Sequence, residues 1–172
     1  MKRHIVLIGL PGSGKTTVGQ LVATRLGAAF VDIDAVIARR EGRPIAMIFA
    51  EKGEGAFREM EKKEMETTLA TEPTVIAPGG GWAAQAGSLE GLRSSSWLVY
   101  LKTRAETAAQ RAGPEGNRPV LSGEDPVARM RVLLKERESS YVQAEVQVET
   151  DRRTPEQVAA EVVRLAQTGA GW

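Results

Sequence analysis

The sequence contains no cysteine and only one histidine, His4. The absence of cysteine excludes disulfides, thiolate metal sites, iron–sulfur clusters and cysteine nucleophiles, and it fits a reducing compartment. A single histidine excludes zinc sites built on several imidazoles. A Ser-His-Asp triad could use only His4, which lies next to the N-terminus. A catalytic metal would therefore need oxygen ligands, which is typical of Mg²⁺.

The chain also lacks a charge excess and a long apolar run. Its 23 Lys+Arg against 22 Asp+Glu leave a formal net charge of +1, which argues against a broad nucleic-acid-binding surface or a polybasic membrane anchor. The apolar run over residues 5–10 stops at Pro11-Gly12 without a cleavage site, and no run is long enough to span a bilayer. We therefore expect a cytoplasmic protein with neither nucleic-acid nor membrane partners.

The 172 residues, 42% of them hydrophobic, are enough for one sizeable core, so we expect a single domain over 1–172. Short apolar runs alternate with helical patterns along the whole chain. This alternation predicts a three-layer α/β/α fold around a central, mostly parallel five-stranded sheet, with ligands at the carboxyl ends of the strands. The expected strands are 5–10, 28–31 ending in Asp32-Ile33-Asp34, 74–77, 97–101 and 146–148. The expected helices are 12–26, 35–40, 44–51, 54–71, one opening near 103, 125–143 and one from 154.

Two of these helices open with the same signal. Thr103 is followed three residues later by Glu106, and Thr154 by Gln157. Threonine followed at this spacing by Glu or Gln is typical of a capping box. We therefore expect each threonine to cap the helix that follows it.

The segment from Gly9 to Thr16 matches the phosphate-loop pattern G-x-x-x-x-G-K-T in full, and it lies between a predicted strand and a predicted helix. Its glycines let successive backbone N–H groups point at a phosphate, and Lys15 can neutralise the β and γ oxygens. Thr16 offers a hydroxyl to Mg²⁺. The motif predicts nucleotide binding, but it does not distinguish a kinase from a GTPase or an ATP-driven switch.

Asp32 and Asp34 lie two residues apart at the end of the second predicted strand. Residues two apart on a regular strand share a face, so both carboxylates would point into the crevice that holds the phosphate loop. One would then bind Mg²⁺, while the other accepts a hydrogen bond from an acceptor hydroxyl and orients it for in-line attack. The alternative for Asp34 is that it is the N-cap of the next helix.

Three arginines are candidate ligands for an anion. Arg137 occupies the apolar stripe of its predicted helix, where it must snorkel, pair with a buried acid or bind a ligand. Arg58 has Glu54 and Glu61 one turn away on either side and is interpreted more simply as the centre of exposed ion pairs. Arg118 lies in a Gly- and Pro-rich loop that suits a lid, and its alternative is a solvated loop charge.

Together these segments resemble the shikimate kinase family, small P-loop kinases that transfer the γ-phosphate of ATP to the 3-hydroxyl of shikimate. The resemblance covers nearly the whole chain and depends on the order and spacing of its parts. These parts are residues 9–17, the Asp32 and Asp34 pair, residues 48–61, the triple glycine Gly79-Gly80-Gly81, residues 118–121, and Arg137 followed by Tyr141.

The resemblance implies a role for each matching position, with ATP and Mg²⁺ as cofactors and shikimate as the small-molecule partner of an expected monomer. It implies an acceptor-binding region at about 33–62 and a lid at about 112–124. Catalysis is assigned to Lys15, Asp34 and Arg118; nucleotide binding to Gly12, Ser13, Gly14, Lys15, Thr16, Thr17, Arg111, Arg118, Arg153 and Pro155; the metal to Thr16 and Asp32; and the acceptor to Asp34, Phe49, Phe57, Arg58, Gly79, Gly80, Gly81, Arg118 and Arg137.

Two other functions compete with this one. A related kinase acting on gluconate or a nucleoside monophosphate would also use paired arginines, since they favour a carboxylate or phosphate acceptor. A nucleotide-dependent switch would hydrolyse ATP without an acceptor, although the chain has no guanine-specifying Asn-Lys-x-Asp motif. Trp82 departs from the resemblance because a smaller residue usually follows the triple glycine, so we expect a narrowed acceptor pocket or a redirected loop.

Overall fold

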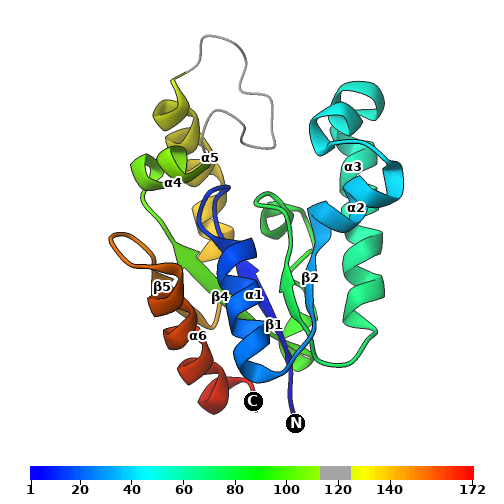
Figure 1. The fold of residues 1–172 in the computed structure, drawn as a ribbon. Helices are drawn as coiled ribbons and strands as arrows, with labels where there is room; N and C mark the ends of the chain where they lie inside the picture. The colour runs from blue at the N-terminus through cyan, green and yellow to red at the C-terminus, as the bar shows by residue number, and fades with distance from the viewer. Residues whose placement is uncertain (113–124) are drawn as a thin grey trace.

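Five parallel strands form a single sheet in the order β2-β3-β1-β4-β5 (Figure 1). The computed structural model describes residues 1–112 and 125–172. The predicted α/β fold with a mostly parallel five-stranded sheet is confirmed, and every described strand pairing is parallel. The strands are β1 His4–Ile8, β2 Phe30–Asp32, β3 Val75–Ala77, β4 Ser96–Lys102 and β5 Val146–Glu149.

The helices follow the strands in alternation, as expected. One helix differs from a regular cylinder, because Gly53 has φ 84° and ψ 168° inside α3 and breaks it. This break separates the two helices that the sequence predicts on either side of residue 53. The helices are α1 Lys15–Leu26, α2 Ile33–Glu41, α3 Ile45–Leu69, α4 Ala105–Ala112, α5 Pro126–Tyr141 and α6 Pro155–Gly169, with short 3-10 turns η1 Trp82–Ala84 and η2 Leu92–Ser94.

The sheet divides the apolar interior into two cores, because successive side chains of a strand point to opposite faces. Ile5 and Leu7 of β1 join the α6-side core, which α1 and α6 complete with residues such as Val22 and Val162. Val6 and Ile8 point the other way. They join the α3-side core, which α2, α3, α4, α5 and η1 complete with Ile33, Ile37, Phe57, Trp82, Ala108, Leu133 and Tyr141.

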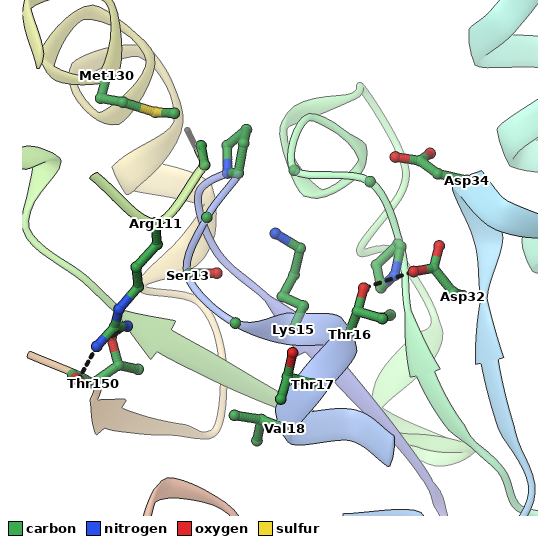
Figure 2. A pocket seen from close by; sticks show the side chains of 18 of the residues that line it. Ser13, Lys15, Thr16, Thr17, Val18, Asp32, Asp34, Arg111, Met130 and Thr150 are labelled. Carbon is green, nitrogen blue, oxygen red and sulfur yellow. Dashed lines mark hydrogen bonds between the residues drawn. The ribbon is translucent and has the colours of Figure 1, made fainter. Parts of the chain in front are cut away.

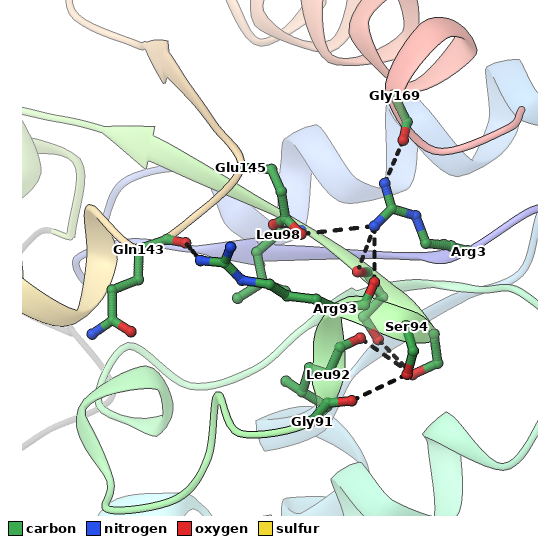
Figure 3. Close-up of polar contacts among 11 residues, drawn as sticks. Arg3, Gly91, Leu92, Arg93, Ser94, Leu98, Gln143, Glu145 and Gly169 are labelled. Carbon is green, nitrogen blue, oxygen red and sulfur yellow. Dashed lines mark hydrogen bonds and ion pairs between the residues drawn. The ribbon is translucent and has the colours of Figure 1, made fainter.

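Polar contacts tie the chain together where the strands begin. The guanidinium of Arg3 donates to the carbonyls of Arg93 at 3.0 Å and Ser96 at 3.3 Å and to the carbonyl of Gly169, and it faces Glu145 at 3.7 Å (Figure 3). Both termini lie at this end of the molecule, away from the carboxyl ends of the strands (Figure 1). Among the described helices, none combines the length and the apolarity that crossing a membrane requires.

Candidate active site

A cavity of about 790 Å³ opens at the carboxyl ends of the strands. The loop after β1 crosses its middle, with Asp32 and Asp34 on one side and Arg111 and Thr150 on the other (Figure 2). This is the edge where ligands bind in open parallel sheets. The cavity therefore has a nucleotide-type end and a second end beside Asp34.

The phosphate loop has the backbone geometry that its glycines permit. Gly12 and Gly14 have φ values of 80° and 95°, and a side chain on Gly12 would place its Cβ 2.3 Å from the carbonyl oxygen of Ala108. The ammonium of Lys15 donates to the carbonyls of Gly9 at 2.8 Å and Leu10 at 2.9 Å. These two bonds hold the ammonium across the loop, and Lys15 itself is the first residue of α1. The positive end of the helix dipole lies at the same place.

Asp32 contacts the phosphate loop directly. The hydroxyl of Thr16 donates to its Oδ2 at 2.6 Å, while its Oδ1 accepts from the amide of Ala35 at 3.0 Å and so caps α2. The expected arrangement on a strand is wrong, because β2 ends at Asp32 and Asp34 lies in the first turn of α2. The N-cap role weighed for Asp34 belongs to Asp32, and both aspartates still line the cavity because the helix begins where the strand ends.

The pair of Thr16 and Asp32 fits a small divalent cation, since hydroxyl and carboxylate oxygens are ligands that Mg²⁺ accepts. In the part of the chain that the structure describes, no group of three or more His, Cys, Asp or Glu side chains is placed to hold a metal. Two protein oxygens would suit an ion that takes its other ligands from phosphate and water.

The triple glycine gathers charged side chains from three helices. A Cβ on Gly79 would lie 2.6 Å from Glu61 Oε2 and 2.9 Å from Asp34 Oδ1, and one on Gly81 would lie 2.5 Å from Arg58 Nη2 and 3.0 Å from Arg137 Nη2. Two carboxylates and two guanidiniums therefore press against one turn. None of the three glycines has a positive φ, so backbone conformation does not require glycine here. The close approach of the charged side chains does.

Arg58 and Arg137 are both largely buried. Arg58 is 11% exposed and donates to Glu61 at 2.8 Å and Glu54 at 3.3 Å. The interpretation as exposed pairs holds for Glu54, but Glu61 is buried with its partner. Arg137 is 8% exposed, so it does not snorkel, and its Nη1 has no hydrogen-bond partner within the described residues.

The aromatic residues of the predicted acceptor end pack against each other. The rings of Phe49 and Phe57 have centroids 4.7 Å apart, and the guanidinium of Arg58 lies 5.4 Å from the Phe57 ring. Trp82 is buried in the α3-side core and is not among the residues that line the cavity. Gly81, Phe49, Phe57, Arg58 and Arg137 are likewise not among the lining residues, so the described acceptor candidates that line this cavity are Asp34, Gly79 and Gly80.

The opposite end of the cavity is lined by Arg111, Arg153 and Pro155, the residues that the family resemblance assigns to the nucleotide. Arg111 donates to the hydroxyl of Thr150 at 3.1 Å and to its carbonyl at 2.9 Å, while Arg153 pairs with Glu161 at 2.6 Å. Sequence reasoning missed Thr150, because nothing in its local pattern marks it. Arg118 and all but the first residue of the predicted lid lie outside the described residues.

Comparisons with known proteins place the chain in a family. A family model described as shikimate kinase matches residues 11–167. A shikimate kinase of Symbiobacterium thermophilum is 42% identical over 95% of this chain and 96% of its own. The structure of shikimate kinase from Acinetobacter baumannii in complex with shikimate is similar with a TM-score of 0.91, at 36% identity over 98% of this chain and 94% of that one.

The fold alone is shared more widely. A gluconokinase structure from Sinorhizobium meliloti 1021 has a TM-score of 0.57 at 22% identity, over 99% of this chain and 92% of that one. The fold therefore leaves the acceptor open, whereas the family match and the identities over nearly full lengths do not. On these grounds the chain belongs to the shikimate kinase family.

Proposed function

We propose that this cavity is where the protein transfers the γ-phosphoryl group of ATP to the 3-hydroxyl of shikimate, the reaction of its family. One observation carries the assignment: Arg58 and Arg137 both approach Gly81. Gly81 directly follows Gly79 and Gly80, which line the same cavity as Asp34 and the phosphate loop. A small carboxylate is held best by planar guanidinium forks, and positioning supplies most of phosphoryl-transfer catalysis.

At the nucleotide end, the amides of the phosphate loop and the ammonium of Lys15 receive the phosphates. Lys15 then exchanges the carbonyls of Gly9 and Leu10 for phosphate oxygens. Arg111, Arg153 and Pro155 hold the base. Mg²⁺, held by Thr16 and Asp32, supplies positive charge beside the transferring phosphate when it is bound.

At the acceptor end, Arg58 and Arg137 bind the carboxylate, and the amides of Gly80 and Gly81 donate to the acceptor. Gly79 leaves the space that Asp34 and Glu61 occupy. Phe49 and Phe57 form the apolar wall. This arrangement fixes the ring by its carboxylate and leaves the hydroxyls facing Asp34.

Asp34 accepts a hydrogen bond from the attacking hydroxyl and aims its oxygen at the γ-phosphorus. The new O–P bond forms as the bond to ADP breaks, and the hydroxyl proton leaves to the carboxylate or to the transferred phosphoryl oxygens. In a loose transition state, orientation and negative charge at Asp34 suffice without complete proton removal.

Arg118 as a lid cation, the monomeric state and the cytoplasmic location stay predictions of the sequence. The function is tested by ADP release from ATP and Mg²⁺ with shikimate, gluconate, nucleoside monophosphates or no acceptor. We expect stimulation by shikimate alone and its loss in Lys15→Ala. Stimulation by another acceptor would overturn the acceptor assignments, and acceptor-independent turnover that still requires Lys15 would indicate the switch.

A further inference from the structure

Tyr141 is a buried residue that touches the acceptor end from behind. It is 0% exposed, it does not line the cavity, and its hydroxyl donates to the carbonyl oxygen of Gly80 at 2.5 Å. This bond joins the last residue of α5 to the triple glycine, 61 positions earlier in the chain.

The three carbonyls of the triple glycine are all engaged by the protein. The amide of Trp82 donates to Gly79 at 3.1 Å, and the side chain of Gln85 donates to Gly81 at 3.0 Å. Both donors belong to the same turn. Tyr141 is the donor from a distant element, so among these three carbonyls it is the middle one that is bonded to α5.

Fixing a carbonyl also fixes the next amide, because a trans peptide unit is planar and holds its N–H opposite its C=O. The bond from Tyr141 therefore sets the direction of the Gly81 N–H. Hydrogen bonding to the carbonyl also polarises the peptide and strengthens the N–H as a donor. No backbone carbonyl of the described residues accepts a hydrogen bond from the Gly80 or Gly81 amide, so these donors are not used in the backbone structure of the turn.

The same helix carries Arg137 one turn before Tyr141. Its Nη2 lies 3.0 Å from the position of a Cβ on Gly81. A rigid helix thus presents a guanidinium to one side of the turn and a phenol to its carbonyl. The relative placement of the carboxylate-binding arginine and the amide donor is set by one element.

We propose that Tyr141 is a positioning residue for the acceptor: it orients and polarises the Gly80–Gly81 peptide so that the Gly81 amide donates to shikimate. It is not a catalytic residue, because it reaches neither the cavity nor the phosphates. The inference rests on the proposed role of the triple glycine in acceptor binding.

Tyr100 provides a matched control. It is 1% exposed, and its ring stacks on Tyr141 with centroids 5.1 Å apart. No hydrogen bond in the described part of the chain joins it to the triple glycine. Tyr100→Phe therefore removes a buried hydroxyl from the same ring pair without touching the turn.

The test compares Tyr141→Phe, Tyr100→Phe and the unaltered enzyme in steady-state kinetics and thermal unfolding. For Tyr141→Phe we expect the KM for shikimate to rise about 3- to 10-fold, the range for loss of one hydrogen bond, with the KM for ATP unchanged. Tyr100→Phe should leave both KM values unchanged. A purely structural role would lower the melting temperature or the active fraction without separating the two KM values.

A second measurement keeps the hydrogen bond intact. The chain has two tyrosines, so 3-fluorotyrosine incorporated into Tyr100→Phe labels Tyr141 alone. We expect its ¹⁹F resonance to shift with shikimate and not with ADP. An unchanged shikimate KM in folded Tyr141→Phe, or a ¹⁹F resonance that ignores shikimate, would overturn the inference. Turnover of shikimate by the unaltered enzyme tests the proposed function separately.

Discussion

Arg58 and Arg137 present guanidiniums to the same glycine, but their charges are balanced differently. Arg58 has two glutamates beside it, one of them buried. Arg137 keeps a buried Nη1 without a hydrogen-bond partner in the described residues, and such a donor costs about 1–3 kcal/mol. Under the proposed function, the shikimate carboxylate would supply this acceptor, and stability would be exchanged for affinity at this residue.

Arg137→Met keeps the apolar stem and removes the charge. We expect the KM for shikimate to rise about 10- to 100-fold, as for loss of a charge-assisted hydrogen bond, while the melting temperature holds or increases. Steady-state kinetics and thermal unfolding measure both. Arg131→Met, an exposed site on the same helix, is the control. An unchanged shikimate KM would contradict the carboxylate assignment.

Two glycines of the site should respond differently to alanine. In Gly81→Ala the new Cβ meets the far end of Arg58, which can move, so the fold should persist and the shikimate KM should rise. In Gly12→Ala it meets the backbone of Ala108 at a φ of 80°, which should cost more than about 1 kcal/mol in unfolding free energy. Denaturant unfolding of both variants checks this, and equal stabilities would refute it.

Residues within a contiguous motif are predictable from sequence because their geometry is local. The phosphate loop and the Lys15 position follow from spacing alone. The crowding around Gly79 and Gly81 does not, because it brings together side chains from α2, α3 and α5. The sequence shows Tyr141 four residues after Arg137, but the bond from Tyr141 to Gly80 depends on how α5 packs on the turn.

At the scale of elements, two identical signals had different outcomes. Thr154 and Gln157 form the capping box of α6, as predicted. Thr103 does not form one, because its hydroxyl pairs with Thr150 at 2.5 Å and α4 begins at Ala105. The competing partner lies 47 residues away in sequence, so a local pattern has no access to it.

Thr150 lies in the turn between β5 and α6, and its hydroxyl and carbonyl both accept hydrogen bonds from Arg111. We expect Thr150→Val, which removes one of the two contacts of the guanidinium, to raise the KM for ATP about 3- to 10-fold and to leave the KM for shikimate unchanged. Initial rates with each substrate varied in turn measure the split. A change in the shikimate KM with an unchanged ATP KM would contradict the assignment of Arg111 to the nucleotide end of the cavity.

Element boundaries at the site were harder to predict than the elements themselves. The alternation of strands and helices predicts the observed sheet, and the expected helices 44–51 and 54–71 leave the gap where Gly53 interrupts α3. The boundary of β2 was wrong because an N-cap at Asp32 starts α2 at once. A three-residue strand leaves too few residues for alternation to reveal where it ends.

For the molecule as a whole, the end where strands begin contributes stability. His4 lies there, and its Nδ1 accepts from the amide of Thr74 at 3.1 Å. Burial lowers the pKa of His4 below its usual 6.5, outweighing its backbone hydrogen bonds with Leu69 and Thr74. Neutral His4 therefore contributes stability that is complete above the unfolded-state pKa and declines as the pH falls toward the folded-state pKa.

His4→Asn, which keeps a side-chain acceptor near Nδ1 but does not titrate, isolates this effect. We expect the unfolding free energy of the unaltered protein, relative to the variant, to decrease as the pH falls below the usual histidine pKa of 6.5. Denaturant titrations above and below this pH give the difference directly. A difference that is independent of pH would show that His4 does not titrate on unfolding.

The two cores on either side of the sheet also bear on engineering. Asp34, Arg58 and Arg137 come from helices of the α3-side core, whereas Val162 and Ala166 of α6 pack on the other face. Stabilising substitutions in the α6-side core should therefore raise heat tolerance while sparing shikimate recognition. In a mutant library, acceptor selectivity and thermal stability would then vary independently: substitutions in the α3-side core would change the first, and substitutions in the α6-side core would change the second.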